Sequence, residues 1–358
     1  MPEKPFEDLT IEKVRRDDLG KLEKLFTSAF ADEVDIEQVK RRIRRTRQFY
    51  YILNPLSKFS LWVKNHFNIY VIKISGELVG FVQVSYINST QMHIDYIAFS
   101  KEYRGQGLGQ WVLAILFSQV ADANNYDVIL EVRVGNRAYN FYKRLGFREM
   151  TEILHYELRL DPAFILPQVV DLPGFRKLAM LERGKLYHLY LESVPITLRR
   201  VIRRTYGEFS PSMMVRHLEW AKNYLMRKQK QDYVVEQDGK IVAWLNVNSY
   251  FKVKSHVISL TIHPDYESLR QGLLSKAVHL IAKNYGPGGV ISTTIYSDDP
   301  GKQVALERLG FSKDLAYYLM FRPAAAKRND SGKSPSHPTK PLPVSSRQCK
   351  KRRYGGKD

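Results

Sequence analysis

The sequence predicts an α/β (α+β) chain of two similar units, each a mixed, mostly antiparallel twisted sheet flanked by helices. Three observations lead to this prediction. A glycine-rich loop joins a strand-like run to a helix-like run, strand and helix patterns alternate through residues 8–160, and short motifs recur 163 or 164 residues later. A chain of 358 residues is also long enough for two domains of ordinary size.

The glycine-rich loop, Arg104-Gly105-Gln106-Gly107-Leu108-Gly109, lies between a strand-like run at 92–99 and a helix-like run at 110–124. Glycine adopts positive φ at little cost, and the free N–H groups at a helix N-terminus bind anions, so the loop predicts a pyrophosphate site. A dinucleotide-binding fold does not fit, because no strand and ribose-binding acid follow at the usual distance. A kinase-type P-loop does not fit either, because no Lys-Ser/Thr pair follows the last glycine.

The runs around this loop predict the rest of the first unit. Ser75-Gly76 is typical of a hairpin turn, and Gly146 is placed to cap a helix, with Phe147 returning into the core. The predicted elements are a helix at 19–30, strands at 69–74, 78–86 and 92–99, the helix after the loop, a strand at 130–134 and a helix that begins near residue 136.

This order and these motifs resemble the GNAT-type N-acetyltransferases. The loop is similar to the family's Arg/Gln-x-x-Gly-x-Gly motif, and residues 136–147 resemble its Asn-x-x-Ala-x-x-aromatic-Tyr-x-x-x-Gly-Phe segment. The resemblance covers roughly residues 8–160 and implies an acetyl-CoA-binding, catalytic domain at 1–160. One spacing departs from the family: Tyr142 lies six positions after Asn136 rather than seven, so either the loop is one residue shorter or Gly135 occupies the Asn position.

The resemblance implies which residues contact acetyl-CoA. The strand before the loop would hold the pantetheine arm by its backbone, the loop would hold the pyrophosphate, and the helix that follows would approach the sulfur. The implied contacts are Ile97, Ala98, Phe99, Arg104, Gly105, Gln106, Gly107, Leu108, Gly109, Asn136 and Tyr142.

The resemblance also implies direct transfer of acetyl to an amine, which needs an acid for the leaving thiolate and a base for the amine. Tyr142 matches the family's general acid, although a core aromatic is the alternative. Glu131 and Asp95 are the candidate bases, with His93 as a substitute, and a salt-bridged strand residue is the alternative for either carboxylate. Glu131 is favoured because Leu-Glu-Val-Arg resembles the strand of ribosomal-protein alanine N-acetyltransferases.

The second unit repeats the first without its chemistry. Runs similar to 76–81 and 145–147 recur at 239–244 and 309–311. The loop of the second unit that corresponds to the glycine-rich loop keeps one glycine and carries Glu267. We therefore predict a linker at 161–173 and a degenerate GNAT-like domain at 174–323. The tandem arrangement resembles that of mycothiol synthase, whose C-terminal copy is the catalytic one, so its substrate is not transferred to this chain.

The formal net charge is +19, and the stretch 324–358 contributes ten Lys/Arg against two Asp. This Pro-, Ser- and Lys-rich stretch predicts a disordered basic tail. Its interpretations are a solubilising tail or weak, non-specific contact with nucleic acid or ribosomes. A second basic cluster, 40–47, is either an exposed helical face or a surface that attracts acidic substrates.

The remaining observations exclude several classes. A single cysteine, Cys349, the lack of an apolar signal region and the lack of a long apolar run predict a cytoplasmic protein without membrane contact. The histidines show no ligand spacing, so we expect no metal. The expected function is acetyl transfer from acetyl-CoA to a primary amine, on a protein N-terminus or a small molecule. The alternative is a non-catalytic acetyl-CoA-binding regulatory or nucleic-acid-associated module.

Overall fold

The strands of the described residues form one twelve-stranded sheet. The computed structural model describes residues 6–29, 68–122, 125–168, 171–251 and 254–325. The first half contributes β1 (Leu9–Lys13), α1 (Asp18–Ala29), β2 (Ile69–Ile74), β3 (Glu77–Tyr86), β4 (Gln91–Phe99), α5 (Leu108–Leu116), β5 (Asp127–Arg133), α6 (Ala138–Arg144) and β6 (Arg148–Arg159). A π-helical turn, Phe117–Ala121, follows α5, and a 3₁₀ turn, Lys101–Tyr103, precedes the glycine loop.

The second half has the same order of strands, with helices between its first and second strands. Its elements are β7 (Phe175–Lys177), α7 (Lys185–Ser193), α8 (Ile196–Arg199), α9 (Tyr206–Phe209), α10 (Met213–Leu225), β8 (Lys228–Gln237), β9 (Lys240–Tyr250), β10 (Ser255–Ile262), α11 (Arg270–Tyr285), β11 (Val290–Tyr296), α12 (Pro300–Arg308) and β12 (Ser312–Arg322). Short 3₁₀ turns lie at Met180–Glu182 and Pro264–Leu269.

The two halves use the same local devices. In the turn between β2 and β3, Ser75 and Gly76 have φ of 49° and 80°, and in the turn between β8 and β9, Asp238 and Gly239 have 49° and 75°. Two successive residues with positive φ are the signature of a type I′ hairpin turn, which suits the twist of the flanking strands. The repeat seen in the sequence is therefore present in the backbone.

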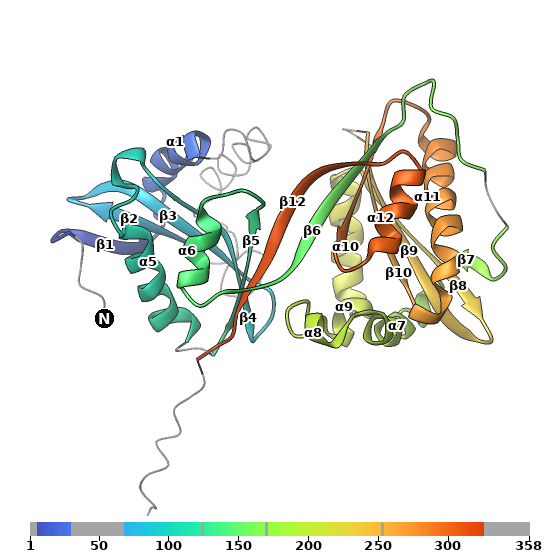
Figure 1. Cartoon of the computed structure of the whole chain (residues 1–358), viewed down its shortest axis with the longest axis horizontal. Coiled ribbons are helices and arrows are strands. Elements are labelled where there is room, and N and C mark those ends of the chain that lie inside the picture. Colours follow the sequence, from blue (N-terminus) through green and yellow to red (C-terminus); the bar gives the residue numbers. More distant parts are fainter. Residues whose placement is uncertain (1–5, 30–67, 123–124, 169–170, 252–253, 326–358) are drawn as a thin grey trace, which may run out of the picture. The chain divides into compact units, whose positions relative to one another are not determined.

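The halves exchange their final strands. The sheet order is β1-β2-β3-β4-β5-β12-β6-β11-β10-β9-β8-β7. Strand β12 of the second half therefore lies beside β5 of the first half, and β6 of the first half lies beside β11 of the second. Tyr317 pairs with Arg133, and Ile153 pairs with Tyr296, while β6 and β12 also pair with each other (Figure 1). Each half thus supplies the strand that completes the other half's sheet.

The fold class is confirmed. Among the described strands, β4 with β5 and β10 with β11 are parallel, and the other neighbouring pairs are antiparallel. Helices flank the sheet in both halves (Figure 1). Because the exchanged strands join the halves, Met1–Ala324 form one compact unit, and the proposed division at 160 and 174 stays a prediction. No helix in the described ranges is both long and apolar enough to cross a membrane.

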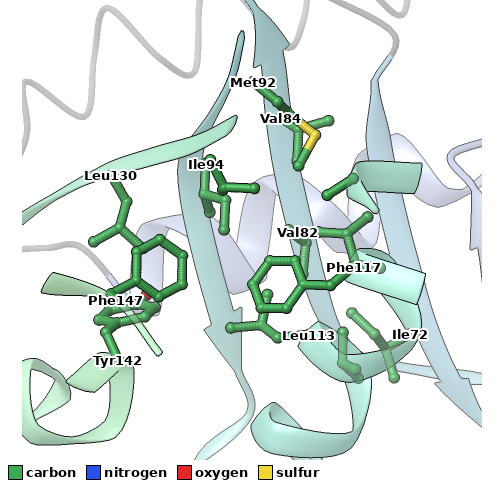
Figure 2. Packing of buried hydrophobic residues seen from close by; sticks show 14 of the residues in the cluster. Ile72, Val82, Val84, Met92, Ile94, Leu113, Phe117, Leu130, Tyr142 and Phe147 are labelled. Atoms are coloured by element: carbon green, nitrogen blue, oxygen red, sulfur yellow. The ribbon is translucent and has the colours of Figure 1, made fainter. Parts of the chain in front are cut away.

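Two apolar clusters cover opposite faces of the first half's sheet. One joins α5 and α6 to the strands through residues such as Leu113, Phe117 and Ile94 (Figure 2). The other joins α1 to the strands through Leu22 and Phe26. Burial of this apolar surface fixes the elements that position the site. The basic cluster at 40–47, the tail from residue 326 onward and Cys349 lie outside the described residues.

Candidate active site

The site begins where two parallel strands part. The ladder between β4 and β5 ends at Ile94 and Leu130, although both strands continue, to Phe99 and Arg133. On the other side of β4, Val84 pairs with Ile94 and Gln83 with Tyr96, so Asp95 is the extra residue of a β-bulge. A bulge redirects a strand and its side chains. The separated strands leave backbone groups of β4 without a neighbour on the β5 side.

A cavity of about 560 Å³ lies at this point. It brings together predicted residues from three elements: Asp95 and Ile97 on β4, Glu131 on β5, Tyr142 on α6, and Asn136 just before α6. Ala98, Phe99 and the loop 104–109 are not among its lining residues; they continue along the chain from the end of the same strand. Some of the residues predicted to contact acetyl-CoA therefore line one cavity, and the others lie further along the chain, outside its lining.

Tyr142 is held in the wall of this cavity by aromatic packing. Its side chain is 6% exposed, and its ring centroid lies 5.7 Å from that of Phe147 and 5.2 Å from that of Phe141. Figure 2 shows Tyr142 beside Phe147 within the apolar cluster. Burial raises the pKa of Tyr142 above its ordinary value of 10, so the phenol keeps its proton at neutral pH.

The two candidate bases have different surroundings. Asp95 accepts a hydrogen bond from Oγ of Ser85, and its Oδ1 lies 2.9 Å from Nδ1 of His93. Glu131 is exposed on β5, and within the described ranges its carboxylate has no hydrogen bond or ion pair. Asp95 is therefore oriented by its neighbours, whereas Glu131 is available to a molecule in the cavity.

The glycine loop has the backbone that an anion site needs. Gly105 and Gly107 both have φ of 78°, and an added Cβ at either would meet nothing within 4 Å. No side chain caps the start of α5, so the N–H groups of its first turn are not satisfied by a capping side chain. At Gly109, a Cβ would lie 3.3 Å from the ring of Phe141, so glycine also allows close packing there.

The polar side chains of the loop brace it. Nε of Arg104 donates to the carbonyl of Phe99 at 2.9 Å, and Nε2 of Gln106 donates to the carbonyl of Glu102 at 2.6 Å. Leu108 is buried in the core, which anchors the first turn of α5. These side chains shape the loop, and its backbone N–H groups remain to face an anion together with the outer guanidinium nitrogens of Arg104.

Asn136 has a structural role as well as a place in the cavity wall. Its Oδ1 accepts a hydrogen bond from the N–H of Ala138 at 2.9 Å, at the start of α6. Gly135 precedes it with φ of 85°, which forms the turn after β5. Contact of Asn136 with acetyl-CoA stays a prediction.

In the second half, the corresponding space is filled by the chain's own side chains. The ladder between β10 and β11 ends at Val257 and Ser292. Beyond that pair, Nζ of Lys302, which is buried, donates to the carbonyl of Leu260 at 3.2 Å. A Cβ on Gly272 would lie 3.0 Å from Leu172. The backbone carbonyl of Leu260 on β10, beyond the point where the two strands separate, thus already accepts a hydrogen bond from Lys302.

Ion pairs also bridge the loop of the second half that corresponds to the glycine loop. Arg270, at the start of α11, lies 2.9 Å from Glu267 and 3.2 Å from Asp299. The second loop thus carries paired charged side chains, where the first half has the bare backbone of Gly105 and Gly107. A cavity of about 560 Å³ lies beside this loop, lined by Leu172, Ser268 and Gly272 among others, but the loop carries ion-paired side chains in place of the glycine backbone of the first half.

The buried amine of Lys302 makes stability depend on pH. Burial lowers the pKa of Lys302 from 10.5 to about 8, with Asp299 opposing and Arg270 adding to this shift. Between these two pH values the unfolded chain binds a proton here that the folded chain has lost, so the free energy of unfolding rises with pH. Chemical denaturation should show a rise across this window that is smaller in Lys302→Met. An identical pH dependence in the variant would contradict this assignment.

Several lining residues were not predicted from the sequence, and two of them come from the exchanged strands. His155 on β6 and Tyr317 on β12 both lie in the cavity wall of the first half. Tyr317 reaches it because β12 pairs with β5. The segments 156–160 and 317–321 are similar in sequence, each beginning with a tyrosine, but this similarity does not indicate exchange. Among the described residues, no group of three or more His, Cys, Asp or Glu side chains could hold a metal ion.

Comparison with known proteins agrees with this geometry. Residues 31–147 match the model of the Acetyltransferase (GNAT) family. An N-alpha-acetyltransferase of Sulfurisphaera tokodaii is 31% identical over 110 residues, which is 27% of this chain and 66% of the relative. The chain thus spans about two thirds of that relative's length.

Solved structures share the fold over most of the chain. A GCN5-related N-acetyltransferase from Sphaerobacter thermophilus has a TM-score of 0.61 at 15% identity, over 89% of this chain and 98% of its own. A tandem GNAT protein from the clavulanic acid biosynthesis pathway has a TM-score of 0.56 at 13% identity, over 89% of this chain and 99% of its own. With its parted strands, glycine loop and family match, this chain belongs to the GNAT superfamily.

Proposed function

We propose that the first half transfers acetyl from acetyl-CoA to a primary amine. The observation that carries this proposal is the cavity at the parted strands, which has a neutral buried phenol in its wall and carboxylates of two strands beside it. This arrangement provides an acid and candidate bases around one space, as acyl transfer requires. In the second half, the hydrogen bond from Lys302 to the carbonyl of Leu260 and the ion pairs of Arg270 support one acetyl-CoA site per chain.

In this proposal, each part of the site has one task. The backbone of Ile97, Ala98 and Phe99 binds the pantetheine arm, and the N–H groups of the loop 105–109 bind the pyrophosphate. The neutral amine attacks the thioester carbonyl carbon, the new C–N bond forms, and the C–S bond breaks. Tyr142 donates its proton to the departing thiolate, and a base removes the proton that the amine nitrogen loses.

Glu131 is the proposed base, with the His93–Asp95 pair as the alternative. Glu131→Gln should lower kcat by about 10²–10⁴-fold if the carboxylate takes the proton directly or through water. Asp95→Asn should then lower kcat less, because it alters the contacts of Asp95 with His93 and Ser85 but keeps the carboxylate of Glu131, the proposed base. Steady-state kinetics of both variants decides between them. A larger loss in Asp95→Asn would assign the base to the His93–Asp95 pair.

The acceptor is proposed to be the α-amine of a protein or peptide, in keeping with the N-alpha-acetyltransferase of Sulfurisphaera tokodaii. A small amine is the alternative. The test is release of coenzyme A thiol with peptides that begin with Met, Ser, Ala or Thr, and with spermidine. The same peptides with blocked N-termini are the controls, and mass spectrometry of the product identifies the acetylated nitrogen. Thiol release with spermidine alone would select the small-amine alternative.

A binding module without turnover remains the competing function. It would bind acetyl-CoA but release no thiol with any amine of that panel. The likeness to ribosomal-protein alanine N-acetyltransferases, the cytoplasmic location and the contact of the basic tail with nucleic acid or ribosomes stay predictions.

A further inference from the structure

The exchanged strand β12 brings the second half into the cavity of the first. Tyr317 pairs with Arg133 of β5, and the next residue on the same face, Leu319, pairs with Glu131. Directly paired residues of antiparallel strands project to the same face of a sheet, and residues two apart share that face. Tyr317 therefore lies on the face of the proposed base Glu131, and both line the cavity.

A second aromatic ring supports Tyr317 from β6. The ring centroids of His155 and Tyr317 are 5.3 Å apart, with an angle of 67° between the planes, which is an edge-to-face contact. Nε2 of His155 is buried and has no hydrogen-bond partner in the described part of the chain. His155 is thus packed against Tyr317 and lines the same cavity.

The surface next to Glu131 also comes from the second half. Leu319 is buried on that face together with Ile153 and Val201, and Tyr296 packs against the same cluster. Burial, opposed by the charge of Arg204 and reinforced by that of Glu131, raises the pKa of Tyr296 to about 12. The face beyond Glu131 is therefore largely apolar, and the Tyr317 ring, the Glu131 carboxylate and the Arg133 guanidinium lie at its edge.

We infer that the exchanged strands β12 and β6 form the acceptor-binding wall of the first half's site, with Tyr317 as a specificity-determining contact and His155 as the residue that positions it. A protonated amine is attracted both by the face of an aromatic ring and by a carboxylate, and its alkyl group packs on apolar surface. The wall therefore fits an alkyl ammonium group, held beside Glu131 before it is deprotonated. This inference rests on the proposed function, since it deepens the acceptor side of the same site.

The test uses bisubstrate probes, in which coenzyme A is joined through an acetyl linker to the α-amine of an alanine-initiated hexapeptide or to spermidine. Calorimetry compares their affinity with that of acetyl-CoA in the wild type, in Tyr317→Leu and in Tyr318→Leu. Tyr318 is the matched control, because it is the next residue of β12 and packs on the opposite face against Tyr139, at 4.6 Å between centroids.

Tyr317→Leu should reduce the affinity for the preferred bisubstrate probe by about tenfold and leave that for acetyl-CoA unchanged. Tyr318→Leu should leave the ratio of the two affinities as in the wild type. His155→Ala should lower the bisubstrate affinity, and His155→Phe should restore it, because packing against Tyr317 needs a ring rather than a nitrogen. With a turnover substrate, Tyr317→Leu should raise the acceptor KM more than it lowers kcat.

The outcomes distinguish a failure of this inference from a failure of the proposed function. If wild-type protein does not bind acetyl-CoA, the proposed function fails. If it binds acetyl-CoA, but neither probe binds more tightly than acetyl-CoA, the acceptor wall is refuted. If a probe binds more tightly and Tyr317→Leu keeps this advantage, the proposed function stands and the role of Tyr317 is refuted.

Discussion

Replacing Tyr142 with phenylalanine should lower kcat by about 10²–10⁴-fold, the usual contribution of a positioned acid. The substitution removes the oxygen and its proton but keeps the ring that packs on Phe147 and Phe141. The thiolate must then leave without a proton donor. Acetyl-CoA affinity should be unchanged, because the predicted backbone contacts are untouched.

Steady-state kinetics and a direct binding measurement together test this expectation. Tyr139→Phe is the matched control, since Tyr139 lies on the same helix and its hydroxyl donates to Glu149 at 2.6 Å, outside the cavity wall. Because burial raises the pKa of Tyr142 above 10, this acid should cause no loss of activity below pH 10. Full activity in Tyr142→Phe would show that another group protonates the leaving sulfur.

Gly107→Glu should abolish acetyl-CoA binding. Gly107 has φ of 78°, and the carboxylate would lie at the loop whose N–H groups are proposed to bind the pyrophosphate. Like charges at this distance repel, and the left-handed backbone strains any residue with a Cβ. In the wild type, acetyl-CoA at 100 times its Kd should stabilise the fold by about 2.7 kcal/mol, seen as a rise in Tm. The variant should show no such rise.

Gly76→Glu is the control for strain and charge. Gly76 has φ of 80°, and an added Cβ there also meets nothing within 4 Å, but it lies in the hairpin turn between β2 and β3. Both variants should lose similar stability without ligand, and Gly76→Glu should keep the rise in Tm with acetyl-CoA. If Gly107→Glu also kept it, the loop would not be the pyrophosphate site.

Local sequence patterns were enough to predict the hairpin turn and the glycine loop of the first half. Gly76, Gly105 and Gly107 take the positive φ that their sequence indicates, since few other residues reach it without strain. The resemblance also named Tyr142, Asp95 and Glu131, which the fold brings to one cavity although they belong to three elements. Their roles stay predictions until the variants are measured.

The strand exchange could not be predicted from the same patterns. The segments that contain Tyr156 and Tyr317 are similar in sequence, and either could supply the same backbone hydrogen bonds beside β5. Which one pairs there is a long-range choice that no local signal encodes. Tyr317 and His155 were missed for that reason. Lys302 was missed because its position on the helix does not reveal that its amine reaches the carbonyl of Leu260.

Calorimetric titration of acetyl-CoA into the wild-type chain tests the central claim most directly. The open groove of the first half predicts a single site per chain, because in the second half Lys302 donates to the carbonyl of Leu260 and Arg270 forms ion pairs across the loop. Binding of one acetyl-CoA, lost in Gly107→Glu and kept in Gly76→Glu, is the expected result. Two equivalent sites would contradict the assignment of the second half, and no binding would contradict the proposed function itself.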